Sequence, residues 1–169
     1  MSKLHQYCLA WLKWACTALQ NEDGWESNFY QWNNLMAEAK ETMSNSFYSS
    51  NAMLDLELCW KISNETEDLA DYAKSNLDQC RDILFKLASS EYPEVRWQVY
   101  EVLGYAGKTA EEQLRKALSD TDSYCKRRAI LSLSKLCPHD ALQLSERFAN
   151  DTDPYIRKAA LELRNCKKD

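Results

Sequence analysis

Few residues of this 169-residue chain have the type and spacing needed for chemistry. Cys137-Pro138-His139 places two potential metal ligands side by side, but a closed zinc site needs four, and no second pair follows. His5 is the other histidine; no serine lies in a G-x-S-x-G context, and no glycine-rich loop could hold a phosphate. We therefore expect no catalytic residues, no metal and no cofactor, and predict that the chain is not an enzyme.

One acidic cluster, Glu65, Glu67, Asp68 and Asp71, offers carboxylates that could hold a cation. The run from Ser63 to Asp68 is, however, typical of a helix N-terminus, where acidic residues favour the helix dipole. The cluster is therefore interpreted as a solvated helix face or as a surface that meets a partner.

Charge is unevenly distributed along the chain. Residues 1–90 carry 7 Lys and Arg against 13 Asp and Glu, a net charge of −6, whereas residues 91–169 carry 14 against 13, a net charge of +1. An acidic protein repels phosphates, so general binding to nucleic acid or to an anionic membrane is disfavoured. The balance favours a basic protein partner, although mild acidity also serves solubility alone.

Cysteine usage and hydropathy predict the compartment. The seven cysteines are odd in number, widely spaced and without a C-x-x-C pair, which indicates buried thiols in a reducing environment. Lys13 makes the N-terminal stretch too polar for a secretory signal, and no run approaches the roughly 18 apolar residues of a membrane span. We therefore expect a cytoplasmic protein.

Apolar spacing predicts helices along the whole chain, and only three glycines and three prolines interrupt it. The first half is expected to form helices over residues 3–20, 26–43 and 52–62, with Gly24 as a left-handed stop after the first. A further helix is expected from about residue 66 to residue 87, with a break near Asn76.

Aromatic residues are concentrated in the first 60 residues, which hold five of the six tryptophans. Packing between irregular helices explains such a concentration. The alternative is that Trp14, Trp25 or Tyr30 stays exposed as an anchor for a partner.

The second half contains three copies of one pattern, over residues 94–104, 124–133 and 155–163. Their aligned first residues are 30 and 31 positions apart, and the tripeptide Asp-Thr-Asp precedes the second and third copies. Each copy follows an amphipathic stretch, so each unit is expected to be a helical hairpin. A period of this length is the signature of a solenoid.

These hairpins resemble HEAT repeats over roughly residues 77–167. The Asp-Pro-Tyr-Ile-Arg-Lys-Ala-Ala run at 153–160 is the most specific part, and Pro93 and Pro154 stand at the expected first-turn position. The middle copy departs from the pattern at Cys125 and Lys126. The resemblance implies an all-α fold: a right-handed α-solenoid in one domain, 1–169, with repeats over 63–169 and an irregular helical N-terminal cap over 1–62.

The resemblance also implies roles for repeated residues. Arg96, Lys126 and Arg157 would pair with turn aspartates of adjacent repeats, drawn from Asp120, Asp122, Asp151 and Asp153. The second helices would line the concave face, with Val95, Val99 and Leu103 pointing into the core. Trp97, Gln98, Glu101 and Tyr105 would project from the first copy, Arg127, Arg128 and Lys135 from the second, and Lys158 and Glu162 from the third. Trp97 could equally pack under the N-terminal helices.

Two functional hypotheses remain open. The first is non-catalytic protein binding: the chain looks like a small bacterial immunity protein that neutralises a basic nuclease toxin, such as a contact-dependent growth inhibition toxin, with a scaffold or adaptor as the alternative. The predicted partner-binding residues are Glu22, Asp23, Glu26, Glu65, Glu67, Asp68, Asp71, Trp97, Glu101 and Tyr105. The second hypothesis is nucleic-acid binding through Lys126, Arg127, Arg128 and Lys158, because HEAT-fold alkylpurine DNA glycosylases hold DNA in a basic groove. HEAT-like bilin lyases have no motif support here.

Overall fold

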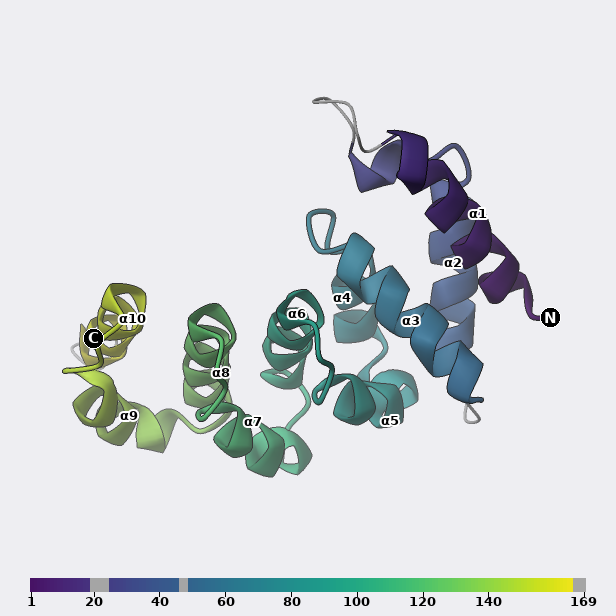
Figure 1. The fold of residues 1–169 in the computed structure, drawn as a ribbon. Helices are drawn as coiled ribbons and strands as arrows, with labels where there is room; N and C mark the ends of the chain where they lie inside the picture. Colours follow the sequence, from purple (N-terminus) through teal and green to yellow (C-terminus); the bar gives the residue numbers. More distant parts are fainter. Residues whose placement is uncertain (19–24, 46–48, 166–169) are drawn as a thin grey trace. The chain divides into compact units, whose positions relative to one another are not determined.

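A computed structural model describes residues 1–18, 25–45 and 49–165 of the chain (Figure 1). These residues form ten α-helices and three short 3-10 helices, and no strand occurs among them, which confirms the all-α prediction. Residue contacts group the chain into two compact units, Met1–Ile83 and Leu84–Asp169, and each is described by itself. The predicted single-domain organisation stays a prediction, and Gly24 lies outside the described residues.

The first unit is built from helices that pack around large apolar side chains. Its elements are α1 (Lys3–Ala18), η1 (Glu26–Asn28), α2 (Trp32–Met43), α3 (Ser50–Ile62), α4 (Asp68–Ser75) and the beginning of α5 (Leu77–Leu87). Helix α1 contacts α2 and α3, and α2 also contacts α3 and α4. Trp60 is fully buried and Trp11 and Trp32 are nearly so, whereas Trp25 and Tyr30 are exposed. Core packing thus accounts for only part of the aromatic concentration.

The predicted helix over 26–43 is wrong at its beginning. The chain forms a short 3-10 turn, leaves it at Phe29 in an extended conformation, and begins α2 only at Trp32. Phe29 is buried against Trp14, with ring centroids 5.6 Å apart. Because burying an aromatic ring outweighs the weak helix propensity of a few polar residues, the packing of Phe29 decides the local path.

The predicted break near Asn76 is confirmed. Asn76 separates α4 from α5 and turns its side-chain amide back to donate to the Tyr72 carbonyl at 2.8 Å. Helix α4 begins at Asp68, two residues after the predicted start, because Glu67 adopts a left-handed conformation with φ of 54°. A residue in that conformation cannot continue a right-handed helix.

The second unit confirms the helical hairpins. Its elements are α6 (Pro93–Leu103), η2 (Lys108–Ala110), α7 (Glu111–Ala117), α8 (Ser123–Leu136), η3 (Pro138–Asp140), α9 (Ala141–Phe148) and α10 (Pro154–Asn165). Helices α6, α8 and α10 form one row, and α7 and α9 lie in a second row beside it (Figure 1). Helix α8 contacts α6, α7 and α10, so each hairpin packs on the next.

Buried side chains join the hairpins of the second unit. Val95, Val99 and Leu103 are fully buried, as the repeat pattern predicted. Gly104 allows α6 to approach α8 closely, because a Cβ at this position would lie 3.0 Å from the Ser132 Cβ. Pro93 and Pro154 begin α6 and α10, where a missing N–H costs nothing. No helix among the described residues is long and apolar enough to cross a lipid bilayer.

Candidate functional site

A largely buried ion pair between Arg96 and Asp120 joins two repeats. The Arg96 guanidinium donates from Nε at 2.8 Å and from Nη2 at 2.9 Å to the two carboxylate oxygens, and both side chains are largely buried. The Tyr100 hydroxyl and the Asp122 backbone N–H donate to the same carboxylate, each at 2.9 Å. Burial alone would raise the pKa of Asp120, but Arg96 and these two donors hold it below its ordinary value.

The predicted Arg–Asp ladder is therefore present at one step. Arg157 makes only the local half of the pattern: its Nη1 donates to the carbonyls of Asp151 and Thr152, as Arg96 does to Ser90 and Glu91. Lys126 forms no ion pair with a turn aspartate in the described part of the chain. Lysine has a single ammonium group in place of a branched guanidinium. It therefore cannot bond its own turn and the aspartate of the next repeat at the same time, as Arg96 does.

Four side chains of α6 and α8 form a polar and aromatic cluster, which we call the α6–α8 cluster: Trp97, Glu101, Tyr124 and Arg128. Trp97 and Tyr124 meet edge to face with ring centroids 5.4 Å apart. The Arg128 guanidinium lies 5.1 Å from the centroid of each ring, and its Nη1 is 2.8 Å from a Glu101 carboxylate oxygen. Trp97 is half-buried and packs against Tyr124 and Arg128, so its side chain does not project freely into solvent. Tyr124 remains 41% exposed and available to a partner.

Tyr105, in the turn after α6, forms a second contact with α8, through Lys135. The Lys135 ammonium lies 4.7 Å from the Tyr105 ring centroid and donates to its hydroxyl at 3.0 Å. Tyr105 is 51% exposed. The face that α6 and α8 share therefore presents aromatic rings whose positions are fixed by neighbouring cations, which lowers the entropy that a binding event would cost.

The predicted acidic residues are partly neutralised inside the first unit. Lys74 lies 3.2 Å from Asp71 and 3.8 Å from Glu67, and Asp68 accepts from the Trp32 indole at 3.3 Å. Lys40 lies 3.8 Å from Asp68, whereas Glu65 is exposed. These residues gather at the beginning of α4 and keep an excess of negative charge.

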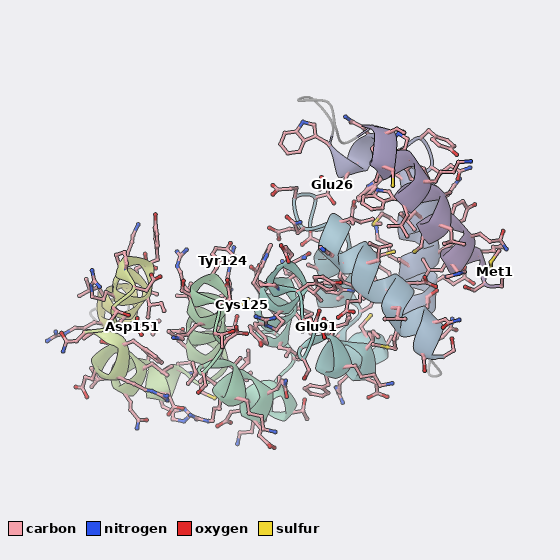
Figure 2. The ribbon with its side chains drawn as sticks, viewed as in Figure 1. Met1, Glu26, Glu91, Tyr124, Cys125 and Asp151 are labelled. Atoms are coloured by element: carbon pink, nitrogen blue, oxygen red, sulfur yellow. The ribbon has the colours of Figure 1, made fainter. Side chains whose placement is uncertain are left out.

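The remaining acidic predictions lie apart from α4 or outside the described residues. Glu26 lies in η1 beside α1, where its carbonyl accepts from the Trp11 indole (Figure 2). Glu22 and Asp23 fall outside the described residues. Trp97, Glu101 and Tyr105 belong to the second unit, so the predicted interface is distributed over both units.

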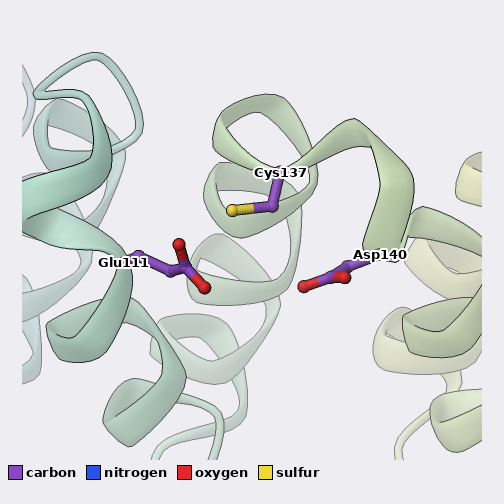
Figure 3. A group of neighbouring side chains, drawn as sticks. All are labelled: Glu111, Cys137 and Asp140. Atoms are coloured by element: carbon purple, nitrogen blue, oxygen red, sulfur yellow. The ribbon is translucent and has the colours of Figure 1, made fainter.

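Glu111, Cys137 and Asp140 place three potential metal ligands within 4.8 Å of one another (Figure 3). The positively charged side chain of Arg115 already occupies this position. Its guanidinium bonds both carboxylates, and Nη2 lies 2.8 Å from a carboxylate oxygen of Glu111. The Cys137 thiol has a raised pKa, first because it is buried and then because it bonds Glu111. The trio therefore pins η3 to α7. His139 lies next to Asp140 in η3 and is exposed.

The histidine and cysteine side chains that could act as bases, metal ligands or nucleophiles have structural partners. His5 bonds the buried Asp55 at 2.9 Å and so ties α1 to α3. The Cys8 and Cys59 sulfurs lie 3.8 Å apart; the bond to Cys8 and burial raise the pKa of Cys59. Burial raises the pKa of Cys80 to about 11 and that of Cys125 to about 12. Thiols with such pKa values are poor nucleophiles at neutral pH.

Two cavities between α8 and α10 were not predicted from the sequence. One, of about 410 Å³, is lined by Ser123, Tyr124, Arg127, Asp153 and Tyr155. The other, of about 310 Å³, is lined mainly by residues of α8, with Glu101 of α6 and Glu162 and Leu163 of α10. A signal did exist, because Tyr124 and Tyr155 occupy the same position of consecutive repeats and thus flank one groove.

A comparison with models of protein families identifies the repeats. The family model described as HEAT repeats matches residues 74–164, which is more than half of the chain. A search of curated proteins gave no match.

Proposed function

Because this chain belongs to the HEAT-repeat family, we propose that it is a non-catalytic protein-binding protein that docks its partner on the face formed by α6, α8 and α10. The observation that carries the proposal is the α6–α8 cluster, which holds aromatic and arginine side chains at the surface in fixed positions. Trp, Tyr and Arg are the residues most enriched among those that dominate binding energy at protein interfaces.

The absence of a catalytic role is part of the proposal. The titratable groups with shifted pKa values are engaged in structural contacts: Asp120 with Arg96, and Glu111 with Arg115. Catalytic groups need a free position for substrate beside them. Duplex DNA containing alkylated purines, incubated with the purified protein, should stay intact and yield no free base; release of a base would contradict this part.

We further propose that the protein is an immunity protein for a basic, nuclease-type toxin. The net charge of −6 in residues 1–90 and the excess of carboxylates at the beginning of α4 support this proposal. Complementary charge speeds diffusional encounter between such partners, and salt reduces that effect. A toxin gene next to the gene for this chain would add independent support.

The test begins with capture of the partner from cell extract and its identification, followed by binding kinetics with the two purified proteins. The double variant Glu65→Lys, Asp71→Lys reverses two exposed charges near α4 and leaves the Asp68 contact to Trp32 intact. The matched control is Asp78→Lys, Asp82→Lys, which makes the same change at exposed positions of α5. Association should slow about tenfold or more in the first variant and should lose much of its salt dependence.

The outcomes separate the two levels of the proposal. Equal slowing in both variants would mean that only net charge matters, and unchanged association in both would remove the acidic patch from the interface. A captured partner that is acidic, or that is not a nuclease, would contradict the immunity role and leave protein binding in place. Retardation of duplex DNA in a gel at physiological salt would contradict protein binding as the primary role.

A further inference from the structure

Arg127 lines the cavity of about 410 Å³ between α8 and α10, and no acidic side chain among the described residues forms an ion pair with it. Its Nε is buried and finds no hydrogen-bond acceptor within the described ranges. The guanidinium of the neighbouring Arg128, by contrast, bonds the Glu101 carboxylate and the Tyr124 hydroxyl. A buried N–H group without an acceptor costs free energy. The terminal nitrogens of the Arg127 guanidinium also form no hydrogen bond or ion pair within the described residues, so these nitrogens are the donors left for an acceptor that enters the cavity from outside the chain.

The surroundings of Arg127 form a pocket. The cavity of about 410 Å³ has Tyr124 and Tyr155 among its lining, 41% and 67% exposed. Tyr124 stands in the first turn of α8, and the turn that contains Asp151 leads into α10 (Figure 2). Two aromatic rings beside a guanidinium give apolar walls for the stem of a side chain and a charged end for its head.

The acidic residue of this pocket is already engaged. Asp153 accepts the backbone N–H groups of Tyr155 at 2.7 Å and Ile156 at 3.2 Å. A hydrogen bond from Ser123 and, to a smaller extent, these N–H groups lower the pKa of Asp153. Its carboxylate therefore caps α10, and it forms no ion pair with Arg127 in the described structure.

We propose that this pocket binds an aspartate or glutamate side chain of the partner protein, with the Arg127 guanidinium bonding the carboxylate and the Tyr124 and Tyr155 rings enclosing its stem. The fork of guanidinium donors matches a carboxylate with two parallel hydrogen bonds. This inference rests on the proposed protein-binding function and adds the chemistry that the repeat face recognises.

A nucleic-acid phosphate fits this groove less well. A strand carries a phosphate at every nucleotide, and Asp153 stands in the wall of the pocket itself. Further along the same pair of helices, Glu101 and Glu162 line the second cavity. A single carboxylate beside Arg127 meets the charge of Asp153 alone, and the backbone N–H groups and Ser123 that bond Asp153 offset that charge. A phosphodiester strand would bring further negative charges toward Glu101 and Glu162 as well.

The experiment is a selection from a random dodecapeptide display library on the full chain, followed by affinity measurements. Arg127→Gln removes the charge, and Arg127→Lys keeps the charge without the fork. Lys108→Gln is the matched control, because it removes one positive charge at an exposed position of η2, outside the helices that form the docking face. Circular dichroism verifies that each variant is folded.

The selected peptides should share an Asp or Glu at one position. They should bind Arg127→Gln roughly 10- to 100-fold more weakly, Arg127→Lys at an intermediate affinity, and Lys108→Gln within about twofold of the unaltered protein. A selection that yields no peptide, peptides without an acid, or equal binding by Arg127→Gln would overturn the proposal.

Two further outcomes keep the pocket and the protein-binding function distinguishable. If a 20-base-pair DNA duplex binds the unaltered protein but not Arg127→Gln, the pocket takes a phosphate and the proposal fails. If the captured protein partner binds Arg127→Gln as tightly as the unaltered chain, the pocket plays no part, although the chain remains a protein-binding protein.

Discussion

Removing the Asp120 carboxylate should destabilise the second unit more than any other single change in the turns between its hairpins. In Asp120→Ala, the largely buried guanidinium of Arg96 loses both of its carboxylate bonds. Loss of one partner from a buried ion pair costs about 3–5 kcal/mol. Arg96 keeps the Ser90 and Glu91 carbonyls, and Tyr100 keeps the Ala88 carbonyl at 3.2 Å. The expected cost is therefore at the lower end, about 3 kcal/mol.

The repeat supplies its own control. Asp151 occupies the equivalent turn position, but its carboxylate accepts only the Asp153 backbone N–H among the contacts described, at 2.9 Å. Asp151→Ala should therefore cost about 1 kcal/mol. For a chain of this length, these values correspond to Tm decreases of roughly 6–12 °C for Asp120→Ala and about 2–4 °C for Asp151→Ala.

Hydrogen exchange at increasing urea concentration, detected by mass spectrometry, measures the free energy of opening of the second unit. Peptides from α6 and α8 report on that unit alone. The exchange-competent opening of these helices should become easier by the amount given above. Equal losses in the two variants, or a loss below about 1 kcal/mol in Asp120→Ala, would refute the view that this ion pair joins the two repeats.

Three further predictions follow from single contacts. The pKa of Asp120 is lower in the folded chain than the ordinary value of about 3.9, so its stabilisation is fully present well above that pH and is lost as the pH falls below it. The difference in urea midpoint between the unaltered protein and Asp120→Ala should therefore be smaller at pH 3 than at pH 6, and a constant difference would contradict the assignment. Gly104→Ala should cost about 1–3 kcal/mol in urea unfolding, because the added Cβ meets Ser132, and an unchanged midpoint would mean that α6 and α8 do not approach so closely. Iodoacetamide at pH 8 should label Cys16 in the folded protein and spare Cys8, Cys59, Cys80, Cys125 and Cys137 until urea unfolds it, whereas rapid labelling of Cys125 would contradict its burial and its pKa of about 12.

The repeats could be predicted because their signals are local and recur. Apolar spacing placed Val95, Val99 and Leu103 in the core, and Pro93 and Pro154 marked the beginnings of α6 and α10. Each signal depends only on residues within a turn or two of helix. The path at Phe29 depends instead on Trp14, which lies in another helix, so no local pattern indicated it.

The candidate site was predicted less completely, because its geometry depends on side chains from separate repeats. Trp97 was identified by type, but its support by Tyr124 and Arg128 depends on how α6 and α8 pack. The bond from Arg115 to Asp140 spans 25 residues and depends on the position of η3. The Arg127 pocket is formed by two consecutive repeats, so neither repeat alone reveals it.

The most direct test of the central claim is the affinity of the captured and purified partner for Trp97→Ala combined with Tyr124→Ala, compared with Lys108→Gln as the control in η2. Loss of two central aromatic side chains at a protein interface typically costs at least 2 kcal/mol. We therefore expect binding to weaken by roughly 30-fold or more in the double variant and by about twofold or less in the control. Full affinity in the folded double variant would contradict the claim that the face formed by α6, α8 and α10 is the docking surface.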